Sequence, residues 1–96
     1  MNFFFHPDAE IELEQAIDYY ENVRQGLGFD FATEAYTAIK RATSLPKAWA
    51  IVEGDIRRSL VYRFPFGILY SIEPKGIYIV AVMNLHRKPS YWQKRR

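Results

Sequence analysis

The residue types that could carry out chemistry gather in the second half of the chain. His86 and Glu53 could act as a general base or acid, and Tyr91 could stack on a nucleobase or relay a proton. Cleavage of RNA through its own 2′-hydroxyl needs a base, a cation for the phosphate and an acid for the leaving oxygen. The candidate phosphate ligands are Arg57, Arg63 and Arg87. Only if the chain is an enzyme of this kind, a metal-independent endoribonuclease, are His86, Arg63, Arg87 and Tyr91 its predicted catalytic residues.

The same side chains also fit roles without catalysis. Arg57 and Arg63 share one face of a predicted strand, which suits either a phosphate-binding surface or pairing with carboxylates. A lone histidine at a strand end, such as His86, is more often a hydrogen-bonded structural residue. The adjacent Tyr91 and Trp92 could bind a partner or fix the tail to the core. The predicted partner-binding residues are Arg57, Arg58, Arg63, Arg87, Lys88, Tyr91 and Trp92.

Length and composition indicate a single domain over residues 1–96. Hydrophobic residues make up 49% of the chain and aromatic residues 17%, which is enough for one well-filled core. The chain has no cysteine, which excludes disulfides and thiolate metal sites. No apolar stretch approaches the length needed to span a membrane. We therefore expect a soluble cytoplasmic protein with no cofactor, bound metal, membrane contact or small-molecule substrate.

Charge is distributed unevenly along the sequence. Residues 1–39 contain eight acidic residues and one basic residue, whereas residues 40–96 contain twelve basic residues and three acidic ones. The tail from His86 to Arg96 contributes five of those bases and no acid. This asymmetry indicates a basic surface that attracts nucleic acid, an acidic protein or both. The alternative is an acidic, solvated helix face beside scattered surface lysines and arginines.

The first half of the chain predicts a short strand followed by two helices. Residues 2–5 form an apolar β-type run, and Pro7 suits the first turn of a helix. Apolar residues then recur every three or four positions, with acidic side chains such as Glu12 mostly on the opposite face. Gly26-Leu27-Gly28 ends this helix, and Pro46 ends a second one. Such a short connection predicts an antiparallel helical hairpin.

The second half predicts strands. After a loop over residues 46–55, even-numbered apolar residues from Ile56 to Phe64 alternate with a face that carries arginine, which predicts a strand with its core on one side. Turns separate it from strands at 68–72 and 77–83. The last is apolar at nearly every position, as in a central strand covered on both faces or in one with a partner on its second face. The order β-α-α-β-β-β predicts an α+β fold. The helical hairpin should pack on one face of a small, mainly antiparallel sheet and leave the other face free to bind.

These features together resemble the RelE/ParE toxin superfamily, whose members are also called plasmid stabilisation proteins. The matching segments are Ala16–Glu21 in the first helix, Gly26–Phe29 at its end, Arg58–Tyr70 and His86–Trp92. They follow the family's order of elements and chain length, and the likeness spans nearly the whole sequence. The resemblance implies the toxin of a bacterial type II toxin–antitoxin module, which inhibits growth until a cognate antitoxin neutralises it.

The resemblance leaves two activities open. RelE-like members cut mRNA in the ribosomal A site, and ParE-like members inhibit DNA gyrase, so the target is either gyrase or the ribosome with mRNA. Many RelE-type nucleases have an arginine before the aliphatic-aliphatic-tyrosine segment of the third strand, where this chain has Gly67. This departure slightly favours gyrase inhibition over endoribonuclease activity. A non-toxic nucleic-acid-binding module is a third hypothesis.

An antitoxin would gain affinity by covering charge and exposed apolar surface together. We therefore expect it to contribute an acidic segment, as an amphipathic helix or an added strand. The groove predicted to receive this segment is rimmed by Arg57, Arg58, Arg63, Arg87 and Lys88. The acidic outer face of the helical hairpin should stay clear of nucleic acid.

Overall fold

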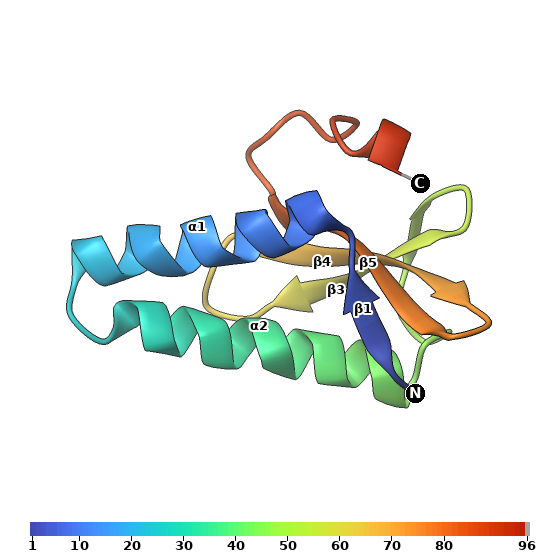
Figure 1. Ribbon diagram of the computed structural model, residues 1–96, viewed down its shortest axis with the longest axis horizontal. Coiled ribbons are helices and arrows are strands. Elements are labelled where there is room, and N and C mark those ends of the chain that lie inside the picture. Colours follow the sequence, from blue (N-terminus) through green and yellow to red (C-terminus); the bar gives the residue numbers. More distant parts are fainter. Residues whose placement is uncertain (96) are drawn as a thin grey trace.

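The computed structural model of the chain describes residues 1–95, which form two α-helices, five strands and a short 3₁₀ helix (Figure 1). The helices are α1 (Pro7–Val23), α2 (Leu27–Ser44) and the 3₁₀ helix η1 (Gln93–Arg95). The strands are β1 (Phe3–Phe5), β2 (Ile51–Glu53), β3 (Ile56–Val61), β4 (Phe66–Glu73) and β5 (Gly76–Asn84). Arg96, the last base of the predicted basic tail, lies outside the described residues.

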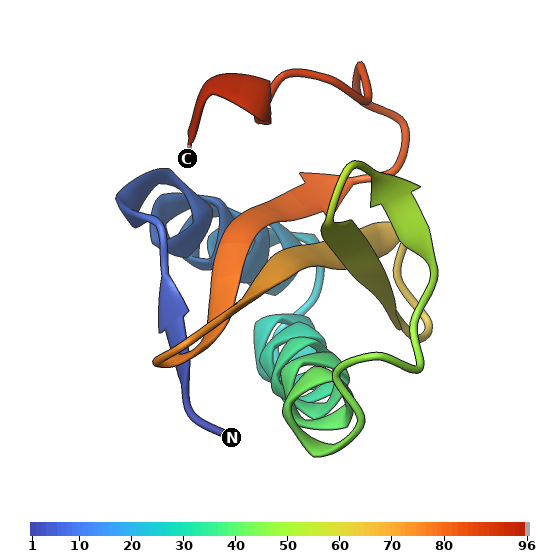
Figure 2. The same ribbon diagram turned by 90° about the vertical axis from the view of Figure 1, so that its right-hand side faces the viewer.

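The strands of residues 1–95 form one sheet in the order β1-β5-β4-β3-β2. Neighbouring strands are antiparallel except β1 and β5, which run parallel. Helices α1 and α2 pack against each other on one face of this sheet (Figures 1 and 2). The arrangement confirms the predicted α+β fold. It also adds β2, a three-residue strand in a segment that the sequence predicted to be a loop.

Side chains at the helix ends explain where the two helices begin. Nδ1 of His6 accepts a hydrogen bond from the backbone N–H of Asp8 at 3.0 Å, which caps the start of α1. The Glu21 carboxylate, in the last turns of α1, accepts from the N–H groups of Gly26 and Gly28 at 3.0–3.1 Å. Its negative charge also suits the positive end of the α2 dipole. The connection between the helices is therefore fixed by a side chain of α1.

Apolar residues cover both faces of the sheet. The larger core, between sheet and helices, comprises Ala9, Leu13, Ala16, Phe31, Ala35, Ala38, Ile39, Ala42, Val61, Phe66, Ile68, Tyr70, Ile77, Ile79 and Val82. The smaller core, on the opposite or free face, comprises Ile56, Leu69, Val80, Ala81, Met83 and Trp92. In β5 the register shifts so that Tyr70 pairs with Ile79 and Leu69 with Ala81, which leaves Val80 as a bulge. The prediction that this strand is covered on both faces is confirmed.

The prediction for the faces of β3 was wrong. Ser59 and Val61, expected on the outer face, point toward the helices, and Ser59 Oγ donates to the carbonyl of Ala38 at 2.8 Å. Leu60, expected in the core, is 44% exposed. Alternation alone does not say which face is the core when both faces carry apolar residues, because Ile56 is buried on the free face. Hydrogen bonding of the serine to a helix carbonyl lets a polar residue occupy the helix side.

The contact between the two helices should not tolerate a methyl group at Gly28. A Cβ there would lie 2.6 Å from the Ile17 carbonyl oxygen and 2.9 Å from Glu21 Cβ, so the helices would have to separate. We expect Gly28→Ala to lower the free energy of unfolding by about 1–3 kcal/mol, measured by urea denaturation. Gly26→Asn is the matched control, because Gly26 has open space around it and asparagine tolerates its positive φ. Equal stability of Gly28→Ala and the parent would contradict the packing described.

Candidate functional site

The free face of the sheet is partly covered by the chain's own tail, residues 85–95. The sequence predicted this face to be open. Trp92 instead packs into the free-face core and is only 4% exposed, with Tyr91 half-buried beside it. Gln93 donates to both carboxylate oxygens of Glu53 at 2.7 and 2.8 Å, which ties the tail to β2. The alternative considered for the aromatic pair, fixing the tail to the core, accounts for Trp92.

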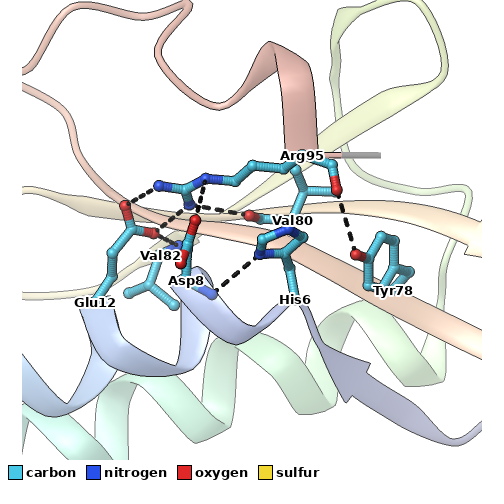
Figure 3. A network of polar contacts seen from close by, with 7 residues as sticks. All are labelled: His6, Asp8, Glu12, Tyr78, Val80, Val82 and Arg95. Carbon is cyan, nitrogen blue, oxygen red and sulfur yellow. Dashed lines mark hydrogen bonds and ion pairs between the residues drawn. The ribbon is translucent and has the colours of Figure 1, made fainter.

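An ion pair between Arg95 and Glu12 holds the end of the tail against α1 (Figure 3). Two guanidinium nitrogens of Arg95 donate to the two carboxylate oxygens of Glu12, each at 2.9 Å. The side chains are only 15% and 12% exposed, so solvent screens the pair weakly. The hydrogen bond to Glu12 raises the pKa of Arg95. Glu12 had been assigned to the acidic outer face of its helix, and this assignment was wrong.

The same two side chains also complete the hydrogen bonding of β5. Strand β1 pairs only with residues 77–79, so the edge of β5 beyond Ile79 has no neighbouring strand on that side. Glu12 accepts from the N–H of Val82 at 3.0 Å, and Arg95 donates to the carbonyl of Val80 at 3.2 Å (Figure 3). The ion pair therefore forms the hydrogen bonds that a neighbouring strand would otherwise form with the Val80 carbonyl and the Val82 N–H.

Tyr91 lies between two arginines. The guanidinium carbon of Arg87 lies 4.0 Å from the centre of the Tyr91 ring, and that of Arg95 lies 4.9 Å from it. Burial and the neighbouring Glu12 carboxylate raise the pKa of the Tyr91 hydroxyl. The ring is thus already stacked within the protein, and the hydroxyl stays protonated near neutral pH.

Arg57 and Arg63 do not share a surface. Arg57 donates to the carbonyls of Lys47 and Trp49 at 3.1 and 2.8 Å, so it braces the segment before β2. Arg63 follows β3 in a turn with φ of 72° and lies near two carboxylates of α2. Its distances to these carboxylates are 3.4 Å for Asp30 and 3.9 Å for Glu34. The predicted strand face with both arginines is not formed, because β3 ends at Val61.

The four predicted catalytic residues are only partly brought together. Arg87 contacts Tyr91, whereas Arg63 contacts carboxylates of α2. His86 and Lys88 are exposed in the turn after β5, where the His86 backbone N–H donates to Asn84 Oδ1 at 2.9 Å. The groove predicted from five basic residues is likewise not assembled as one unit, since Arg57 and Arg63 serve other contacts.

Arg58 has a different environment from these arginines. It is half-buried on the free face, yet its guanidinium forms no hydrogen bond or ion pair with another residue of 1–95. Its aliphatic stem crosses Gly67, where an added Cβ would lie 3.0 Å from Cγ and Cδ of Arg58. The glycine that departs from the nuclease pattern therefore makes room for an arginine of the neighbouring strand.

Two hollows adjoin Arg58. One has a volume of about 280 Å³ and is lined mainly by apolar side chains of the free face and tail, including Leu69, Met83 and Trp92, together with Glu53. The other, of about 180 Å³, lies beside Leu60 and Tyr62 and is also lined by Arg41. A partly desolvated cation between mainly apolar hollows suits a carboxylate flanked by apolar side chains, because charge-assisted hydrogen bonds strengthen where water is excluded. We regard this surface, centred on Arg58, as the candidate binding site.

The fold is similar to that of solved structures. The chain superposes with a TM-score of 0.70 on a structure described as the chromosomal ParDE TA (toxin–antitoxin) system from P. aeruginosa. The match covers 90% of this chain and 97% of that chain at 14% sequence identity. The chain has a RelE/ParE-like fold. No family model matches the sequence, and no curated protein matches it either.

The RelE/ParE-like fold agrees with the order of elements on which the sequence resemblance rested. Within residues 1–95, no group of three or more histidine, aspartate or glutamate side chains is arranged to hold a metal ion. No helix in the same range is long and apolar enough to cross a membrane.

The Arg95–Glu12 pair should contribute strongly to stability. Arg95→Ala would leave a largely buried carboxylate without its counter-ion, and we expect a loss of about 3 kcal/mol in the free energy of unfolding. Glu12→Ala should cost a similar amount, while the double variant should lose less than the sum, with a coupling energy of about 1–3 kcal/mol. Urea denaturation of the four proteins measures the cycle. Strict additivity would show that the two side chains do not interact.

Alkaline pH should reveal how much the buried Tyr70 hydroxyl contributes to stability. Burial raises the pKa of Tyr70 to about 12, and its hydroxyl donates to the Pro46 carbonyl at 2.7 Å. Its unfolded pKa is about 10, so the protonated hydroxyl stabilises the fold fully below about pH 10, and this contribution is lost as the pH rises toward 12. The stability difference between the parent and Tyr70→Phe should therefore shrink over that range. A stability difference that stays constant between pH 10 and 12 would contradict this prediction.

Proposed function

We propose that this protein is the toxin of a bacterial type II toxin–antitoxin module, acting in the cytoplasm and neutralised by a cognate antitoxin. The observation that carries the proposal is the structural match to a ParDE system over 97% of that chain. The four sequence segments that resemble the RelE/ParE superfamily lie on the same fold.

We further propose a protein target, with DNA gyrase as the candidate. Three features support a protein rather than RNA. Arg63 is near carboxylates, the Tyr91 ring and hydroxyl are enclosed within the tail, and Arg58 lies between apolar hollows. An mRNA endoribonuclease would need a base, a cation and an acid around one phosphate, and the candidate residues do not converge in this way.

The antitoxin is proposed to cover the basic part of the free face. Because Arg57 and Arg63 already contact other groups of the same chain, the predicted groove is reduced to Arg58, Arg87 and Lys88. An acidic segment with aliphatic anchors would neutralise Arg58 and fill the hollows on either side of it. A bound antitoxin would also prevent the target from reaching Arg58, and in this way it would neutralise the toxin.

Controlled expression in bacteria tests this function. We expect growth arrest with a DNA damage response and, for the purified protein, inhibition of supercoiling by gyrase. Arg58→Gln should weaken inhibition at least about tenfold, because it removes a central charged contact. Lys94→Gln is the matched control, since Lys94 is an exposed basic residue of the tail. Circular dichroism verifies that both variants are folded.

Other outcomes would identify the alternatives. Ribosome-dependent mRNA cleavage that disappears in His86→Ala would indicate a RelE-like endoribonuclease and contradict the gyrase proposal. Absence of any growth effect, together with binding of single-stranded nucleic acid, would indicate a non-toxic binding module and contradict the toxin proposal.

A further inference from the structure

A second surface, away from Arg58, lies along β1 at the margin of the sheet. Strand β1 is the last strand on its side of the sheet, and Figure 2 shows it at the outer margin of the molecule. The carbonyl of Asn2 accepts from Ile77 N–H at 2.8 Å, and His6 N–H donates to the Ile79 carbonyl at 2.9 Å. Because backbone groups alternate in direction along a strand, the N–H and C=O of Phe3 and Phe5 point to the outer edge.

This edge is held in a fixed position. At Gly76, which has φ of 138°, an added Cβ would collide with the Asn2 carbonyl oxygen, so β1 lies directly against the turn between β4 and β5. The ring of Phe4 stacks on Tyr78 with centroids 5.0 Å apart. The edge is therefore preformed, and a partner strand would not have to order it.

Aromatic side chains remain exposed on both sides of the edge. Phe3 is 42% exposed and its ring lies 6.5 Å from that of Tyr36 on α2, which is 46% exposed. On the other side Phe4 is 39% exposed. A hollow of about 690 Å³ lies between β1 and α2, and another of about 440 Å³ lies beside Tyr78. Alternate side chains of an added strand would reach these two hollows in turn.

Two lysines set the charge of this surface. Lys40 lines the larger hollow, and Lys75 lines both. Neither forms an ion pair with another residue of 1–95. The nearby Glu73 carboxylate already accepts a hydrogen bond from Ser71 Oγ at 2.6 Å. A second copy of this chain pairing through the same edge would bring its own two lysines to the surface, and like charges disfavour that arrangement.

We propose that the outer edge of β1 binds an extended, acidic segment of a partner protein as an added strand. The outward-facing backbone groups of Phe3 and Phe5 supply the hydrogen bonds, the two hollows take alternate apolar side chains, and the lysines select carboxylates. The site goes beyond the proposed toxin function and does not require it.

Peptide titration followed by NMR tests the proposal. The probe is a capped nine-residue peptide with three consecutive valines at its centre, which point to both sides of an added strand, and glutamates on either side of them; it is added to the full-length ¹⁵N-labelled protein. We expect amide shifts at residues 2–6, Tyr36, Lys40 and Lys75, and at least about tenfold weaker binding of the matching valine–lysine peptide. No binding, equal binding of the two peptides, or shifts confined to the surface around Arg58 would overturn the proposal.

Two variants separate edge pairing from charge. Phe3→Pro removes an outward N–H without touching the bonds to β5 and should abolish binding, whereas Phe3→Leu keeps the N–H and should retain it. Lys40→Glu combined with Lys75→Glu should reverse the preference toward the lysine peptide. Retained binding by Phe3→Pro, or an unchanged preference in the double variant, would overturn the proposal.

Two further measurements examine other occupants. A ten-nucleotide single-stranded DNA that shifts the same amides with higher affinity would assign the surface to nucleic acid instead. A dimer in analytical ultracentrifugation that dissociates in Phe3→Pro would assign it to a second copy. The titration has no growth readout, so its failure leaves the toxin proposal standing, and a non-toxic protein could still bind the peptide.

Discussion

The backbone of β5 imposes the constraint on which the rest of the structure depends. This strand is buried on both faces, so each of its N–H and C=O groups needs a partner. Strand β1 supplies partners for only three residues before the chain turns into α1. Glu12 and Arg95 supply the next ones from the two ends of the sequence. The position of α1, the path of the tail and the cover on the free face all follow from this requirement.

The uneven charge of the sequence acquires a structural meaning from this arrangement. Basic residues of the second half fold back on acidic residues of the first, with Arg95 on Glu12 and Arg63 near Asp30. Several basic residues of the second half are therefore paired with acidic residues of the same molecule. The number of basic residues overstates the positive charge that a partner could bind. What remains on the surface includes Arg58 on the free face, together with lysines near β1.

The sequence predicted the helices, the order of the main strands and the fold class, because helical periodicity, glycine and proline are local signals. It did not predict β2, since three exposed residues carry no period. The faces of β3 were assigned wrongly because apolar residues lie on both sides of the sheet. The Glu12–Arg95 pair joins residues 83 positions apart, and no local pattern marks such a pair. Arg58 was among the predicted binding residues, but only the structure separates it from Arg57 and Arg63.

The contact between Arg58 and Gly67 makes the residue types that positions 58 and 67 can hold depend on each other. The long arginine stem crosses the neighbouring strand where residue 67 has no side chain, and an added Cβ would press on its Cγ and Cδ at 3.0 Å. A lineage that gained a large residue at 67 would have to shorten or redirect residue 58, and glycine at 67 leaves the arginine stem in place. In a collection of related sequences the two sites should thus covary, with the cation carried by one strand or the other.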